Sequence, residues 1–118
     1  MQEKPEERGV HNPRVVDLVT RDEGTGEVVL VMVEERPWQG EAQLRQVEAK
    51  FNAYFEYVVG GHLATQYPQY AELPVRIQLD CSENPRAEDH PFFTAMRNFA
   101  AVENIRMVLT VIQLHGEP

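Results

Sequence analysis

The stretch that most constrains the fold is residues 27–38, EVVLVMVEERPW, which contain six successive apolar residues at positions 28–33. Short β-branched apolar runs between glycine and proline are typical of strands buried on both faces. Gly26 and Pro37 bound this run. We therefore expect an inner strand of a sheet here, with a charged and aromatic corner where the chain leaves it.

The composition limits the class of protein and its partners. A chain of 118 residues is long enough for one domain with its own core. The net charge of −8 and the lack of a Lys/Arg cluster argue against nucleic acid or an acidic membrane as partner. Cys81 is the only cysteine, so no internal disulfide is expected. Because no signal peptide or membrane span is recognisable either, we expect a cytoplasmic protein.

The first half of the chain predicts a hairpin followed by a helix. Residues 15–20 are apolar and β-branched, and the Gly-bearing loop RDEGTG joins them to the organising strand, which is typical of a β-hairpin. A stripe with helical spacing follows, formed by Leu44, Val47, Phe51, Tyr54, Phe55 and Val58. Lys50 falls among the charged residues expected outside this stripe. The Gly60-Gly61 pair predicts the helix end.

The second half predicts strand, helix and strand. Residues 75–81 alternate strictly, which indicates a strand with one buried face that includes Cys81. Asp89 is a candidate N-cap for a helix with a Phe-rich stripe, and Asn104 suits the left-handed position at its end. Residues 107–114 form the last expected strand. Residues 14–115 would then be a single α/β domain between tails at 1–13 and 116–118.

The element order ββαβαβ leaves two sheet arrangements open. Right-handed crossovers make the last three strands parallel and the first antiparallel to the second. Strand order 1-2-3-4 places both helices on one face, whereas order 1-2-4-3 places one helix on each face. In the second arrangement the polar side chains of Arg76, Gln78 and Asp80 would lie beneath the Phe-rich helix. We therefore favour order 1-2-3-4, a two-layer sandwich.

That arrangement leaves one face of the sheet without a helix. Val29, Val31 and Val33, or the residues that alternate with them, would then need another cover. Large exposed apolar patches usually mark contacts with other molecules. We therefore expect a homodimer that forms through this face or through an edge strand.

Any site is expected at the carboxyl ends of the parallel strands, where ligands of open α/β sheets bind. The sequence has no Gly-rich phosphate loop, no CxxC, no HExxH and no GxSxG motif. The ligand-binding candidates at this edge are Glu34, Glu35, Trp38, Asp80 and His115. Each also has a structural interpretation: a solvated or capping carboxylate, a packed corner indole, or a histidine in a solvated tail. We expect no metal site and no cofactor.

Several segments resemble a known group of proteins. The stretches DLVTRDEGTGEVVLVMVEERPW, NAYFEYV, QYP and PVRIQLDC resemble a family of small uncharacterised bacterial proteins classed as a domain of unknown function. The similarity spans roughly residues 15–111. It implies a bacterial, intracellular, single-domain protein, and it brings no activity, cofactor or catalytic residue.

Two functional hypotheses follow from the sequence. The first is a non-catalytic, self-associating interaction domain that binds its own copy or another protein. The alternative is a small ligand- or metal-binding protein, possibly an enzyme, that uses the strand-end residues named above. The first is favoured because the sequence contains none of the strong catalytic motifs.

Overall fold

The computed structural model describes residues 18–112. The expected tails and His115 lie outside this range. The elements are β1 (Leu18–Arg21), β2 (Val28–Glu34), α1 (Glu41–Val59), α2 (His62–Gln66), β3 (Val75–Cys81), α3 (His90–Ala101) and β4 (Ile105–Val111), with short 3₁₀ turns at Pro68–Tyr70 and Ala87–Asp89.

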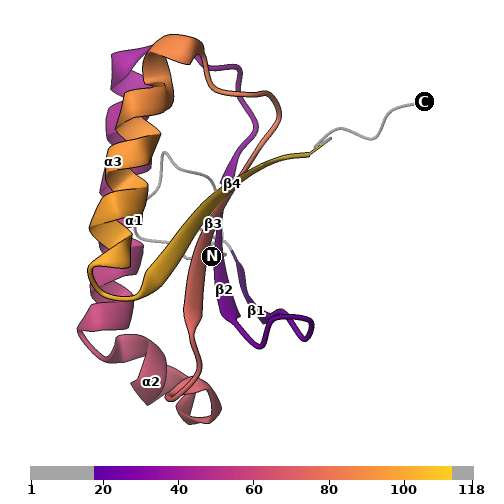
Figure 1. The fold of residues 1–118 in the computed structure, drawn as a ribbon, viewed down its shortest axis with the longest axis vertical. Helices are drawn as coiled ribbons and strands as arrows, with labels where there is room; N and C mark the ends of the chain where they lie inside the picture. The colour runs from indigo at the N-terminus through magenta and orange to yellow at the C-terminus, as the bar shows by residue number, and fades with distance from the viewer. Residues whose placement is uncertain (1–17, 113–118) are drawn as a thin grey trace, which may run out of the picture.

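The sheet has the order β1-β2-β3-β4, with β1 antiparallel to β2 and the other three strands parallel. Figure 1 shows α1 and α3 on the same face of this sheet, and no helix of residues 18–112 lies on the other face, which we call the open face. The predicted two-layer α/β arrangement is therefore confirmed, and the alternative order 1-2-4-3 is wrong. Two right-handed crossovers that proceed in one direction across a sheet place their helices on the same side.

The hairpin turn between β1 and β2 is organised by Asp22. One carboxylate oxygen accepts hydrogen bonds from the backbone N–H groups of Gly24 at 2.9 Å and Thr25 at 3.3 Å. The N–H of Gly26 donates to the Asp22 carbonyl at 2.7 Å. Gly26 has φ +80°, a conformation that glycine adopts at little cost. The Gly-bearing loop predicted from RDEGTG therefore closes the hairpin as expected.

The core lies between the helices and one face of the sheet. The strands contribute the fully or nearly fully buried side chains Val28, Leu30, Met32, Ile77, Leu79, Cys81, Ile105 and Met107, and the helices contribute Val47, Phe51, Tyr54, Phe93, Met96 and Ala100. The buried series in β3 follows the predicted alternation. Burial of this apolar surface, at roughly 25 cal/mol per Å², is the main force that holds the two layers together.

Helix α1 places the predicted apolar stripe against the core, with Leu44, Phe55 and Val58 partly buried, and adds two polar residues to it. Its buried residues are Gln43, Val47, Lys50, Phe51 and Tyr54. The expectation that Lys50 lies outside the buried stripe is wrong, since its side chain is fully buried and its Nζ lies 5.8 Å from the centroid of the Tyr54 ring. The four-carbon stem of lysine packs as an apolar group, which a binary apolar/polar pattern cannot detect.

The boundaries of α3 show one wrong and one confirmed prediction. Asp89 precedes the helix but makes no side-chain capping hydrogen bond. Its two carboxylate oxygens instead accept from the Arg86 guanidinium, each at 3.1 Å. Asn104 follows the helix with φ +61°, as its left-handed propensity predicts.

Candidate functional site

Among the predicted site residues that the structure describes, Glu34 at the end of β2 is the most buried, with 2% of its surface exposed. Arg36 binds both carboxylate oxygens: Nε donates to Oε1 at 2.8 Å and Nη2 to Oε2 at 2.6 Å. The Arg36 backbone N–H also donates to Oε1 at 2.9 Å. The same guanidinium reaches the Gln46 side chain on α1 at 2.8 Å. The carboxylate therefore joins the exit of β2 to α1.

The ionisation of Glu34 reflects these contacts. Burial raises the pKa of its carboxyl group, but the Arg36 side chain and backbone and the nearby Gln43 amide lower it by more, so the net shift is downward. Gln43 is buried and its Oε1 accepts from the Gln39 backbone at 2.7 Å. Its Nε2 group makes no well-formed hydrogen bond, but it lies close enough to Glu34 to lower the pKa of that carboxyl. This corner thus contains one ionised carboxylate with an amide donor beside it.

Trp38 packs into the corner and is 7% exposed. Its indole N–H donates to the Glu83 carbonyl at 2.9 Å, and its ring meets Phe93 edge to face with centroids 5.6 Å apart. Glu35 is exposed, and its backbone carbonyl accepts a 3.1 Å hydrogen bond from the Ser82 hydroxyl. These contacts connect the exit of β2 to the loop after β3.

Asp80 lies on the other face of the sheet from Glu34. The parallel register pairs Val33 with Asp80 and Glu34 with Cys81, and successive residues of a strand point to opposite faces. The Asp80 carboxylate accepts from the Gln78 amide at 2.8 Å on the open face. The structure therefore brings together Glu34, Trp38 and the backbone of Glu35, and it separates Asp80 from them.

Cys81 is fully buried beside this corner and donates a weak hydrogen bond to the Thr110 carbonyl at 3.6 Å. Burial raises the pKa of its thiol to about 11, and the charges of Asp80 and Glu34 add to the shift. A thiol with this pKa is a poor nucleophile at neutral pH. Among residues 18–112, no group of three or more His, Cys, Asp or Glu side chains is arranged to hold a metal ion.

The open face of the sheet exposes less apolar surface than the sequence predicts. Val29 and Val31 point toward this face, yet they are only 2% and 5% exposed. The expectation that Val29 and Val31 need cover from another molecule is therefore wrong, whereas Val33 is half-buried. A network of ion pairs occupies the same face at the amino-terminal end of the parallel strands.

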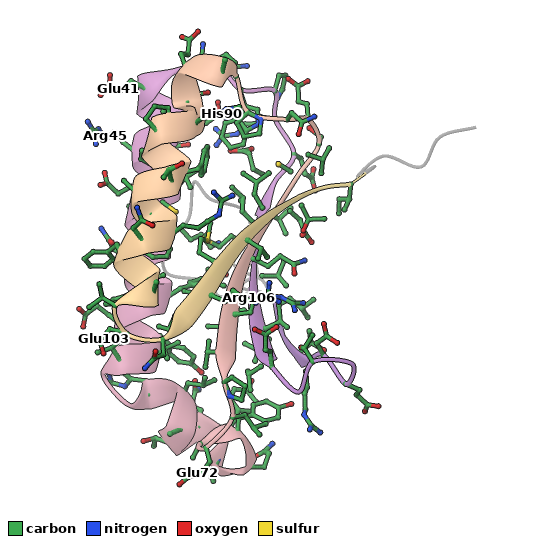
Figure 2. The ribbon with its side chains drawn as sticks, viewed as in Figure 1. Glu41, Arg45, Glu72, His90, Glu103 and Arg106 are labelled. Carbon is green, nitrogen blue, oxygen red and sulfur yellow. The ribbon has the colours of Figure 1, made fainter. Side chains whose placement is uncertain are left out.

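Glu27 is the centre of that network. Arg76 Nη1 lies 2.7 Å from its Oε1, and Arg106 donates to both of its oxygens at 2.8 and 2.9 Å. Arg76 also binds Asp22 of the hairpin turn at 3.1 Å. Figure 2 shows Arg106 on the side of the sheet away from the helices. The network connects β2, β3, β4 and the hairpin turn.

The hydrogen bonds from Arg106 are the largest cause that lowers the pKa of Glu27, from its ordinary 4.5 to about 2, against the opposing effect of burial. The Thr25 hydroxyl and Arg76 contribute in the same direction. This group of ion pairs was not predicted from the sequence. The predicted strand order contained a signal for it. Arg76 and Arg106 occupy paired positions of neighbouring strands, and two cations placed this way favour an anion between them.

The outer edge of β4 is a further candidate for binding. Within residues 18–112, β4 pairs with β3 and has no strand on its other side. The backbone N–H of Ile112 donates to Cys81 at 2.9 Å, so by alternation residues 105, 107, 109 and 111 direct their N–H and C=O groups away from the sheet. Val111 is 42% exposed. A hollow of about 290 Å³ beside this edge is lined by Leu109, Phe93 and Arg97, among others.

These features define a small two-layer α/β domain whose buried charges at the strand ends and on the open face connect its elements. The chain belongs to a protein family of unknown function (DUF6572), which matches residues 9–113. The resemblance to a domain of unknown function is thereby confirmed. No curated protein and no solved structure matches the chain. In the part of the chain that the structure describes, no helix has the length and apolar character to span a membrane.

Replacement of Glu27 by glutamine is expected to lower the free energy of unfolding by about 1–2 kcal/mol at pH 7, because Arg76 and Arg106 lose their common anion. The lowered pKa of Glu27 gives a pH dependence with a defined sign. Its contribution is fully present above pH 4.5, decreases as the pH falls toward about 2, and is lost below that value, where the carboxyl is protonated in both the folded and the unfolded state. Urea unfolding at several pH values measures both effects.

The control for this experiment is Glu23→Gln, which removes the same charge from an exposed position of the hairpin turn. An equal loss of stability in both variants, or a loss in Glu27→Gln that persists unchanged at pH 2, would contradict the role assigned to Glu27.

Arg36→Ala is expected to destabilise the domain by about 2 kcal/mol, and Glu34→Gln by about half as much. The difference arises because loss of Arg36 leaves the buried Glu34 carboxylate without its cation, whereas Arg36 is 43% exposed and can be hydrated when Glu34 is neutral. Urea unfolding at pH 7 measures both values. Arg45→Ala is the control, since Arg45 pairs with Glu41 and Glu48 at the exposed surface of α1 (Figure 2). The reverse order of the two effects would refute the interpretation.

Proposed function

We propose that this chain is a non-catalytic interaction domain that associates with a second copy of itself through the outer edges of two β4 strands. The observation that carries the proposal is a seven-residue apolar edge strand with no strand on its outer side within residues 18–112. Exposed strand edges pair readily with other strands. Native proteins usually protect such edges with proline, lysine or a bulge, and IRMVLTV contains neither proline nor lysine.

The sequence of β4 suits antiparallel pairing with its own copy. A two-fold axis at Val108 pairs Ile105 with Val111 and Met107 with Leu109, and these are the residues whose backbone groups point outward. This register forms about eight hydrogen bonds between the two strands. On the open face, Val108 meets Val108 of the copy and Arg106 meets Thr110, so no like charges face each other.

The charge of the chain opposes this association at long range. Each copy has a net charge of −8, and two such copies repel each other at low ionic strength. Because salt screens this repulsion over about 10 Å at 0.1 M, the dimer is expected to become more stable as salt is added. An interface that depended on ion pairs between the copies would show the opposite dependence.

Light scattering across a concentration series tests the proposal. The wild-type chain is expected to approach twice its mass of 13.6 kDa, more readily at higher salt. Val108→Lys should weaken association by about tenfold or more, because it places two ammonium groups at the two-fold axis. A wild-type mass of 13.6 kDa at about 100 μM and at both salt concentrations would refute self-association.

Thr20→Lys is the matched control for this substitution. Thr20 is exposed on the open face of β1, at the opposite edge of the sheet, and the change adds the same charge. Both variants reduce the net repulsion equally, so weaker association of Val108→Lys alone identifies the β4 edge. Equal association of the two variants would exclude that edge.

One observation favours the second candidate function, a small-ligand site at the β2 corner. The Gln43 Nε2 group is buried and makes no well-formed hydrogen bond, although the Glu34 carboxylate lies near it, and this is uncommon for a buried side-chain donor. A ligand acceptor atom beside Trp38 and Glu34 would satisfy it. The Arg36 guanidinium already occupies the Glu34 carboxylate, so this candidate ranks below the interaction domain.

A thermal-shift screen with divalent metals, nucleotides and common metabolites tests this candidate. A true ligand at one hundred times its Kd should add about 2.7 kcal/mol of stability. The effect should be lost in Gln43→Met, which removes the amide, and retained in Gln69→Met, an exposed site in the Pro68–Tyr70 turn. A screen without any stabilising compound would eliminate the corner as a site for these classes.

A further inference from the structure

A groove runs between α1 and α3 on the side of the helices away from the sheet, with a volume of about 410 Å³. We call it the aromatic groove. The buried side chains of Phe51 and Met96 lie at its base, and Phe92, Ala95 and Phe99 of α3 form one wall. The opposite wall belongs to α1 and contains Glu48 and Asn52. It is a different surface from the β4 edge and from the β2 corner.

The apolar part of the groove is exposed, and its aromatic rings contact one another. The Phe99 side chain is 52% exposed, and its ring packs on Phe55 with centroids 4.8 Å apart and on Phe51 at 6.2 Å. Val102, one turn beyond Phe99, is 78% exposed. Because these rings already support one another across the two helices, a ligand that covers them has little side-chain freedom to remove. Exposed aromatic surface of this kind is typical of a contact site.

The α1 wall is acidic. Glu48 lines the groove and its side chain is 45% exposed. Glu56 is exposed and follows Glu48 and Asn52 along the same helical row, at intervals of four residues. The residues that line the groove include no lysine or arginine. Arg45 pairs with Glu48 at 3.0 Å, but this exposed pair is weak enough for a partner's cation to replace it.

We propose that the aromatic groove binds an amphipathic helix of a partner protein. Apolar side chains at helical spacing enter the groove between Phe92 and Phe99, and Lys or Arg residues beside them face Glu48 and Glu56. A partner helix suits this site because the groove is a channel between the side chains of α1 and those of α3. A partner strand does not suit it, because the backbone groups inside α1 and α3 are already paired and cannot bind a strand.

The acidic wall also distinguishes between a partner and a second copy. Two copies that met through this groove would place their Glu48 and Glu56 rows near each other, in addition to a net charge of −8 on each. Like charges across an interface disfavour association. The chemistry of the groove therefore fits a basic partner, and the inference does not depend on the β4 dimer.

Fluorescence anisotropy with the full chain tests this inference. The probe is a labelled synthetic peptide of about four helical turns, with leucine at i, i+3, i+4 and i+7 and lysine at most other positions. One control peptide has glutamate in place of each lysine, and another has the same composition without the helical spacing. The lysine peptide is expected to bind with at least about tenfold higher affinity than either control.

Variants of the chain then locate the binding site. Ala95→Lys places a long cation in the groove at an exposed position of α3 and should weaken binding by about tenfold or more. Ala42→Lys makes the same change at an exposed position early in α1 and should leave it unchanged. Glu48→Gln should weaken binding about threefold. Glu72→Gln should not weaken it, because Glu72 lies outside the groove, at the opposite end of the molecule from Glu41 in Figure 2. Circular dichroism confirms that each variant remains folded.

Three results of the peptide experiment would overturn the inference. They are failure of the lysine peptide to bind, equal binding of the peptide without helical spacing, and equal affinity of Ala95→Lys and Ala42→Lys. Loss of self-association in Ala95→Lys alone would assign the groove to a second copy, which also contradicts the proposal. The β4 substitutions do not change any residue of the groove. A negative result in the dimer test therefore leaves the peptide-binding result valid.

Discussion

The constraint on which the rest of the structure depends is that both crossovers proceed in the same direction across the sheet. The handedness of βαβ units then requires α1 and α3 to lie on one face. Within residues 18–112, no helix covers the other face. Among these residues, the side chains of the strands themselves stabilise that face. In this domain the ion pairs of Glu27 with Arg76 and Arg106 join β2, β3 and β4 at that face.

Most of the fold could be predicted from the sequence because its signals are local. The alternation in residues 75–81, the Gly-bearing hairpin loop and the Gly60-Gly61 helix end each follow from backbone geometry over a few residues. The strand order followed from one further argument, the mismatch between the polar face of β3 and the Phe-rich helix. The buried face of α1 could not be predicted in the same way. Lys50 and Gln43 count as polar in any binary pattern, yet packing against the sheet decides which side they occupy.

The candidate site was harder to predict, for a related reason. Carboxyl ends of parallel strands meet at one edge, but the edge has two faces, and a shift of one residue changes the face. Glu34 and Asp80 differ by one step in register and thus point to opposite faces of the sheet. The hydrogen-bond partners of individual side chains could not be predicted from the apolar/polar pattern of the sequence either. Nothing local to Glu34 specifies that Arg36 will bind both of its oxygens, or that the Trp38 indole will donate to Glu83.

The single cysteine has a practical consequence. The Cys81 thiol lies between the sheet and the helices, has no exposed surface and has a pKa of about 11. Alkylating reagents therefore need an opening of the structure that exposes this side chain, and burial also keeps its thiolate fraction low until then. The rate at which Cys81 is chemically labelled therefore measures how often the structure around β3 opens. It reports the kinetic stability of the domain without any engineered probe.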